Sequence, residues 1–243
     1  MPVTDILIIL FGLALLSLAI VSVVNQRERR RRAIALHLNT MRRRAQRLEE
    51  LAIEVDQLLE SRTIPRLIND QILRLVEQMR QASPDAVYLD ALQQTAQARA
   101  DALADEGMPV VLDRLKESDL QIARAKNNLE DTAATLNGLR NRNVIDVEEM
   151  SEFARQLKWA SLMVEALSLI GQGHKALRRS DIMSAHAFYK KAQHALMKST
   201  HSDPRRHRMI KELSEILTGK RSAMSEDLMP ESHLNPRPAP ENL

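Results

Sequence analysis

The sequence has no cysteine, and it has only 6 glycines and 2% aromatic residues among its 243 residues. Without cysteine the chain cannot form a disulfide, a Cys-ligated metal site or a thiol nucleophile. Scarce glycine, few β-branched runs and no sustained alternation of apolar and polar residues argue against a sheet-based fold. Alanine, leucine, arginine, glutamate and glutamine, which favour helices, are abundant. The sequence therefore predicts an all-α protein.

Positive charge is concentrated near the N-terminus. Residues 1–47 contain nine arginines against Asp5 and Glu28, a sum of +7, whereas the rest of the chain has 26 basic and 30 acidic residues, a sum of −4. A nucleic-acid-binding surface would combine basic side chains with aromatic rings for stacking. We therefore expect no nucleic-acid partner.

An uncharged apolar run occupies residues 6–24, and as a helix it would be about 28 Å long, close to the hydrocarbon thickness of a bilayer. A cleaved signal peptide would have basic residues before the run, but only Asp5 precedes it and arginines follow it. Basic flanking residues stay in the cytoplasm. Residues 1–26 are therefore expected to be a single-pass anchor in a bacterial inner membrane, with the N-terminus outside and the C-terminal part in the cytoplasm. We expect the side chains directly after the run to contact anionic lipid headgroups: Arg29, Arg30, Arg31 and Arg32.

Residues 27–63 are predicted to extend this helix as an arginine-rich stalk. Apolar residues recur there at alternating spacings of four and three, which is a heptad seam. Its proposed self-association positions are Ile34, Leu38, Met41, Leu48, Val55 and Leu59. Two interpretations stay open: two chains pair along the seam as a homodimer, or the seam packs on the chain's own helices.

Proline and glycine divide the remaining sequence into helical stretches, expected at 66–82, 85–105 and 109–141. The last has Leu115, Ile122, Leu129 and Leu136 at heptad spacing. Residues 64–142 are assigned to a helical bundle and 143–218 to a helical hairpin with flanking helices. Residues 219–243 hold four of the nine prolines, so a disordered tail is expected there.

Small and aromatic residues recur with a distinctive spacing in residues 166–204. Ala185, Tyr189 and Ala192 follow the pattern A-x3-[FY]-x2-A, Gly173 lies one helix earlier, and the turn falls at 180–181. This hairpin resembles a single tetratricopeptide repeat. The resemblance implies two closely packed antiparallel helices, with Tyr189 filling the space beside the small residues, and a protein-binding groove.

The sequence departs from that repeat in two respects. The aromatic positions of the first helix are Leu169 and Ala176 here, and Pro204 lies about two turns later than the closing proline of the repeat. No second copy is visible, so neighbouring helices would have to cover both faces of the hairpin.

The sequence shows no dinucleotide, P-loop, HExxH, EF-hand or GxSxG motif. Five histidines fall in its last third: His174, His186, His194, His201 and His207. Because His186 and His194 lie two turns apart with few carboxylates nearby, we interpret these histidines as solvated side chains. We expect no catalytic residues, no cofactor and no bound metal.

Together these features predict a membrane-anchored cytoplasmic scaffold or adaptor that recruits an unidentified protein through a helical surface. One alternative is a spectrin-like coiled-coil rod that acts in cell-envelope organisation or division. A further alternative is a His-dependent metal sensor or enzyme.

Overall fold

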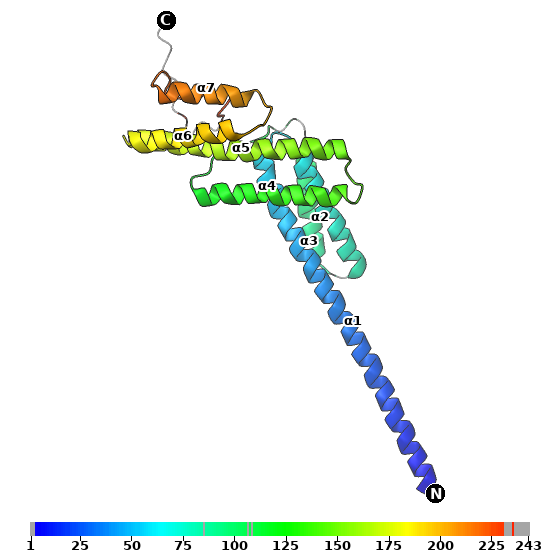
Figure 1. Ribbon diagram of the computed structural model, residues 1–243. Helices are drawn as coiled ribbons and strands as arrows, with labels where there is room; N and C mark the ends of the chain where they lie inside the picture. The colour runs from blue at the N-terminus through cyan, green and yellow to red at the C-terminus, as the bar shows by residue number, and fades with distance from the viewer. Residues whose placement is uncertain (1–2, 85, 106, 108, 231–234, 236–243) are drawn as a thin grey trace. The chain divides into compact units, whose positions relative to one another are not determined.

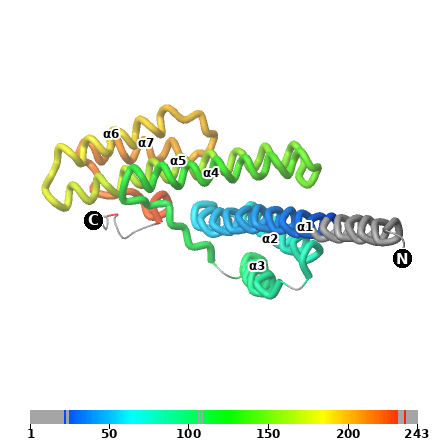
Figure 2. Tube along the Cα trace, turned by 90° about the horizontal axis from the view of Figure 1, so that it is seen from below, coloured from blue at the N-terminus to red at the C-terminus, as the bar shows by residue number. Residues whose placement is uncertain are grey.

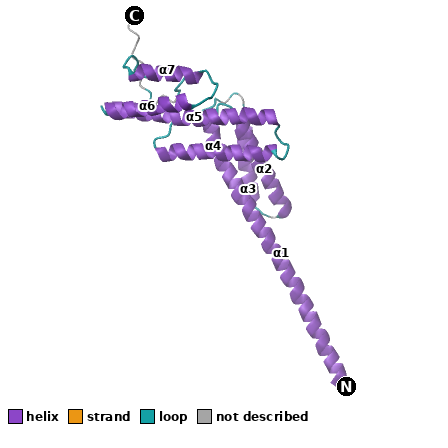
Figure 3. Cartoon of the chain, in the orientation of Figure 1, coloured by secondary structure: helices purple, strands orange, loops and turns teal. Residues whose placement is uncertain are grey.

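The computed structural model describes residues 3–84, 86–105, 107, 109–230 and 235; for residues 3–21, 23 and 24 it describes the helix but not the side chains. The described residues form helices and no strands (Figure 3). The predicted all-α class is therefore confirmed. The helices in Figure 1 are α1 (Val3–Leu58), α2 (Thr63–Ala82), α3 (Tyr88–Ala104), α4 (Asp119–Arg140), α5 (Val147–Arg178), α6 (Ile182–Lys198) and α7 (Arg205–Leu217).

Helix α1 includes the apolar run at residues 6–24. Apart from Ser22, the side chains of that run lie outside the described set. Within the described residues, none of the helices combines the length and the apolarity that crossing a bilayer requires.

The chain divides into two compact units, and each is described by itself. The first comprises Met1–Arg47 and Gln71–Gln97. Within it, Arg80 Nη2 lies 2.6 Å from Asp90 Oδ1, and the Arg42 guanidinium lies 5.2 Å from the centre of the Tyr88 ring. The second comprises Leu48–Asp70 and Ala98–Leu243.

Helix α5 is central to the second unit, because α4 and α6 both pack against it and α7 packs against α6 (Figure 1). Its first turn has a capping box at Asp146: Glu149 N donates to Asp146 Oδ1 at 2.7 Å, and Asp146 N donates to Glu149 Oε2 at 3.0 Å. Each side chain satisfies a backbone N–H that the helix leaves unpaired. After α5 ends at Arg178, Ser180 adopts a left-handed backbone conformation with a φ of 61°. The Asp181 side chain then caps α6 by accepting from Ser184 N.

The prediction of a helix over 109–141 is wrong for its first ten residues. Helix α4 begins at Asp119, where Ser118 caps it by accepting from Gln121 N. The preceding segment makes tertiary hydrogen bonds instead: Lys116 N donates to Ser168 Oγ at 2.8 Å. Leu115, predicted to lie on the helical seam, is buried in the core from this irregular segment. The other seam positions, Ile122, Leu129 and Leu136, are buried on α4.

The prediction of a disordered tail is wrong for residues 220–230. Met224, Leu228 and Met229 are buried in the same core cluster as Leu115, and Figure 2 shows this segment (red) beside the one before α4 (green). The Glu212 carboxylate fixes it by accepting from Ser225 N at 2.8 Å and from Ser225 Oγ at 2.6 Å. The proline content of this segment does not indicate whether its apolar side chains are buried in a core. The rest of the predicted tail, except Asn235, lies outside the described residues.

The heptad positions of α1 differ in how deeply they are buried. Leu48, Val55 and Leu59 are at most 5% exposed, so the chain itself covers them and they offer little surface to a second copy. Ile34 is 46% exposed, and Leu38 and Met41 are half-buried. Self-association stays a prediction for these last three positions only.

Candidate functional site

The four predicted hairpin residues meet in the interior between α5 and α6. Tyr189, Ala185 and Ala192 are at most 1% exposed. A Cβ placed on Gly173 would lie only 2.7 Å from Tyr189 Cδ1, so the glycine allows the tyrosine ring to pack directly on the α5 backbone. These residues pack the hairpin, as expected, but they are not accessible to a partner.

His174 is not the solvated side chain expected from the sequence, because it is fully buried. Its Nδ1 lies 2.8 Å from the Tyr189 hydroxyl. Burial, with a smaller contribution from the charge of Arg178, lowers the pKa of His174 to about 4, and burial raises the pKa of Tyr189 to about 12. The spacing of Leu167, Ile170 and His174 at three and four residues places the histidine on the apolar face of α5 and could have revealed it.

The other predicted features lie at the surface or make local contacts. Arg29, Arg30, Arg31 and Arg32 are exposed, and Arg32 Nη2 pairs with Glu28 Oε1 at 3.1 Å. His201 bonds the backbone, with Nε2 3.2 Å from Arg155 O. In the part of the chain that the structure describes, no three histidine or carboxylate side chains gather closely enough to hold a metal ion.

A long groove runs along α5 between α4 and α6. It consists of two hollows of about 760 and 870 Å³ that share Lys126, Glu130, Glu165 and Lys198. We call their union the α5 groove. Its α5 residues extend from Ser151 to Leu169, a helical length of about 27 Å. Its apolar lining residues are Ile122, Ala123, Leu129, Ala133, Ala154, Leu157, Leu162, Leu169 and Ala195.

The two walls of the α5 groove differ in charge. The α6 wall carries Lys190, Lys191 and Lys198, and helix α6 contains no acidic residue. These lysines form no ion pair with any described residue. On the α4 side, Lys126 Nζ is neutralised by Glu165 Oε2 at 2.7 Å. One wall is therefore left with uncompensated positive charge.

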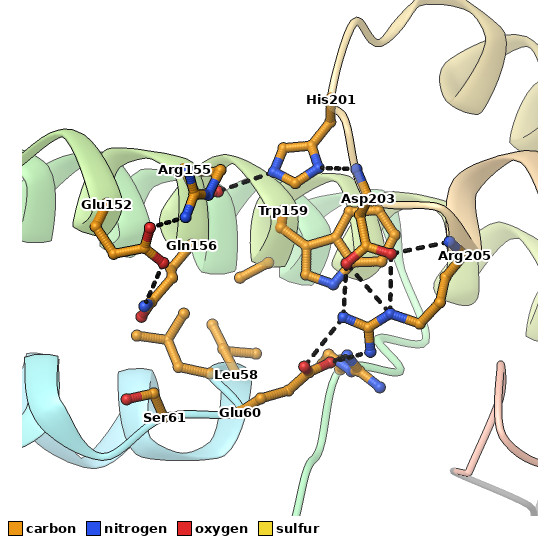
Figure 4. A pocket seen from close by; sticks show the side chains of 13 residues that line it. Leu58, Glu60, Ser61, Glu152, Arg155, Gln156, Trp159, His201, Asp203 and Arg205 are labelled. Atoms are coloured by element: carbon orange, nitrogen blue, oxygen red, sulfur yellow. Dashed lines mark hydrogen bonds and ion pairs between the residues drawn. The ribbon is translucent and has the colours of Figure 1, made fainter.

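A separate cavity of about 310 Å³ lies between the end of α1, helix α5 and the loop before α7 (Figure 4). Arg205 organises its charged side: Nη1 and Nη2 lie 2.7 and 3.1 Å from the two Glu60 oxygens, and Nη2 lies 2.8 Å from Asp203 Oδ2. The guanidinium also stacks over the Trp159 ring, 4.9 Å from its centre. Arg114 Nη1 adds a contact to Glu60 Oε1 at 3.3 Å. We call these five residues the Arg205 cluster.

The Arg205 cluster keeps its carboxylates ionised. Burial alone would raise the pKa of Glu60, but the hydrogen bonds from Arg205 and the charges of Arg205 and Arg114 outweigh it, so the pKa is lowered. The hydrogen bond from Arg205 likewise lowers the pKa of Asp203, and both carboxylates raise the pKa of Arg205. This cluster could not be predicted from the sequence, because Glu60 and Arg205 are 145 residues apart and no local pattern links them.

No protein-family model, curated protein or solved structure matches the chain. The geometry offers two places for a ligand: the α5 groove, which follows α5 from Ser151 to Leu169, and the smaller cavity beside the Arg205 cluster.

Proposed function

We propose that the protein is a membrane-anchored adaptor that binds an amphipathic helix of a partner protein in the α5 groove. The main support for this proposal is the hollow that runs along α5 between α4 and α6. A helix laid there would pack on α5 beside α4 and α6, and insertion of an apolar helix face into a groove is a recurrent mode of recognition. The resemblance of the α5–α6 hairpin to a tetratricopeptide repeat supports the same use.

The charge of the groove specifies the chemistry of the partner. The α6 wall presents Lys190, Lys191 and Lys198 without ion pairs to described residues. A partner helix with acidic residues along the edge that faces α6 would pair with these lysines, which favours rapid association and fixes its orientation. The partner is therefore an amphipathic helix with an apolar face and one acidic edge.

Reversing charge on the α6 wall is expected to abolish partner binding. A photo-crosslinking residue at Ser161, on the groove, is placed in the full chain in its native membranes. The double variant Lys190→Glu/Lys198→Glu should reduce the resulting crosslink at least tenfold, because acidic residues then face acidic residues. The matched double variant Lys211→Glu/Lys220→Glu has the same net charge at exposed positions outside the groove and should retain it.

A charge swap decides between specific and incidental crosslinking. Lysine substitutions on the acidic edge of the crosslinked helix should restore the crosslink to the Lys190→Glu/Lys198→Glu chain. Equal crosslinking by both double variants, or failure of the swap to restore it, would contradict the proposal.

The membrane part of the proposal rests on the apolar run at residues 6–24 and the exposed arginines that follow it. Each arginine near an anionic surface contributes about 1 kcal/mol of attraction. Two charges in the run, Leu15→Arg and Leu16→Arg, should move the chain from carbonate-washed membranes to the supernatant, since each costs about 2.5–3.5 kcal/mol at the bilayer centre. Leu36→Arg, at a position that is 69% exposed, is the control and should stay in the membrane. Recovery of the wild-type chain in the supernatant would refute the anchor.

A further inference from the structure

The turn that joins α5 to α6 exposes large apolar side chains. Residues 177–183 are all exposed, and they include Leu177 at 40%, Ile182 at 59% and Met183 at 83%. In Figures 1 and 2 this turn (yellow) extends past the first residues of α4. We call residues 177–183 the hairpin tip, and it lines neither the α5 groove nor the cavity beside the Arg205 cluster. Exposed apolar side chains that cluster beside charged ones mark sites of contact with a protein or a membrane.

The structure of the turn does not require these apolar residues. The turn is formed by Ser180, with its left-handed backbone, and by Asp181, whose carboxylate caps α6. Ile182 and Met183 occupy the first positions of α6, where acidic side chains would stabilise the positive end of the helix. Helix α6 has no acidic residue in its first turn. The exposed isoleucine and methionine therefore indicate a role other than stabilising the fold.

The hairpin tip lies in a strongly basic part of the chain. Residues 166–202 contain six basic residues and one acidic residue, Asp181, which is a sum of +5. The basic residues are Lys175, Arg178, Arg179, Lys190, Lys191 and Lys198. None of them forms an ion pair with a described residue, and the Asp181 carboxylate accepts from Ser184 N instead. The charge around the tip is therefore positive and uncompensated.

We propose that the hairpin tip inserts into an anionic bilayer surface. Leu177, Ile182 and Met183 enter the boundary between headgroups and acyl chains. Arg178 and Arg179 contact the lipid phosphates. Protein segments that lie at a bilayer surface combine these two elements, because buried apolar side chains and attraction to anionic lipids both strengthen the contact.

An acidic protein surface is the other partner that the charge would fit, but the shape of the tip favours a bilayer. Apolar side chains at the end of a helical hairpin need a partner with a matching hollow, whereas a bilayer accepts them without one. The positive charge also extends along α6 beyond the tip, as expected for attraction to a wide anionic surface. The inference rests on the proposed function in one respect, because the anchor at residues 6–24 would keep the tip near a bilayer.

Because the chain has no cysteine, a single reporter can be placed on the hairpin tip. Met183→Cys, labelled with a nitrobenzoxadiazole fluorophore, is made in the full chain and reconstituted into vesicles. One set contains phosphatidylcholine alone, and the other contains equal parts of phosphatidylcholine and phosphatidylglycerol. Lipids that carry a nitroxide on the acyl chain quench the fluorophore where it enters the bilayer. Quenching should be about tenfold stronger in the anionic vesicles, because the arginines attract the tip to them.

A second reporter and a charge variant provide the controls. Met197→Cys is also at an exposed position of α6, about 21 Å further along the helix, and should stay unquenched in both sets. Arg178→Gln/Arg179→Gln should reduce quenching at position 183 about tenfold in anionic vesicles. Lys211→Gln/Lys220→Gln removes the same charge at exposed positions outside the tip and should leave it unchanged. Equal quenching at positions 183 and 197, or equal effects of the two double variants, would overturn the proposal.

Flotation of the same vesicles tests the anchor separately. A chain that floats with the vesicles but shows no quenching at position 183 would retain the anchor and overturn the contact of the tip. Quenching at position 183 in anionic vesicles that persists with Leu15→Arg/Leu16→Arg would support the contact without the anchor. Absence of quenching in anionic vesicles overturns the inference whether or not the chain floats, and it leaves an acidic protein surface as the partner of the tip.

Discussion

Replacing Gly173 with alanine is expected to destabilise the second unit by about 1–3 kcal/mol, the usual cost of overpacking a core. The new Cβ would lie 2.7 Å from Tyr189 Cδ1 and 3.0 Å from Cζ. The ring is rigid and buried, and its hydroxyl is held by His174 at 2.8 Å, so the clash cannot be relieved by a side-chain rotation. The free energy of unfolding, measured by urea titration, checks this.

Gly138 provides a matched control for the same substitution. A Cβ there would meet no atom within 4 Å, so Gly138→Ala should stabilise α4 by up to about 1 kcal/mol through helix propensity alone. The two variants are thus expected to have effects of opposite sign. Adding Tyr189→Leu to Gly173→Ala should remove much of the clash and make the two substitutions non-additive. Equal stability of Gly173→Ala and Gly138→Ala would disprove the close packing of glycine and tyrosine.

Acidification is expected to destabilise the fold through His174. The pKa of this side chain falls from its ordinary value of 6.5 to about 4 in the folded chain, so below pH 6.5 the unfolded chain binds a proton that the folded chain does not. Stability must then decrease as pH falls and level off near pH 4. The expected loss is about 2 kcal/mol between pH 6.5 and 5, and about 3 kcal/mol by pH 4.

The window from pH 6.5 to 5 separates the effect of His174 on stability from the effects of Glu60 and Asp203. The lowered pKa values of Glu60 and Asp203 also reduce stability in acid, but only below their ordinary values of 4.5 and 3.8. The raised pKa of Asp56 has the opposite effect, because its folded form takes up the proton first. Urea titrations across this window should give a flat profile for His174→Asn and the wild-type slope for His207→Asn, whose side chain is exposed. A wild-type slope in His174→Asn would contradict the assignment.

Local patterns predicted much of the fold, because they report local interactions. The heptad spacing of Ile122, Leu129 and Leu136 and the spacing of Ala185, Tyr189 and Ala192 each describe one face of a single helix, and the structure buries both sets. The start of α4 could not be predicted from local patterns, because the segment before it is held by hydrogen bonds to residues far away in the sequence. Leu115 continued the heptad spacing, yet the backbone beside it bonds Ser168, 52 residues from Lys116.

The candidate sites could be predicted less well from the sequence. The α5 groove exists only because α4 and α6 lie on either side of α5, and the charges of Lys190 and Lys198 look like an ordinary solvated helix face until that arrangement is known. The same is true of the Arg205 cluster, since Glu60 and Arg205 are 145 residues apart in the sequence. The sequence gives the residue types, but only the tertiary structure shows which of these side chains lie together at one site.

The segment after α7 constrains the order in which the second unit is assembled during synthesis. The core of the second unit contains Leu115 together with Leu228 and Met229. During synthesis, Leu115 leaves the ribosome long before Met229 does. Domains whose core lies early in the chain can fold while translation continues. The native core of the second unit is therefore complete only after Met229 has left the ribosome.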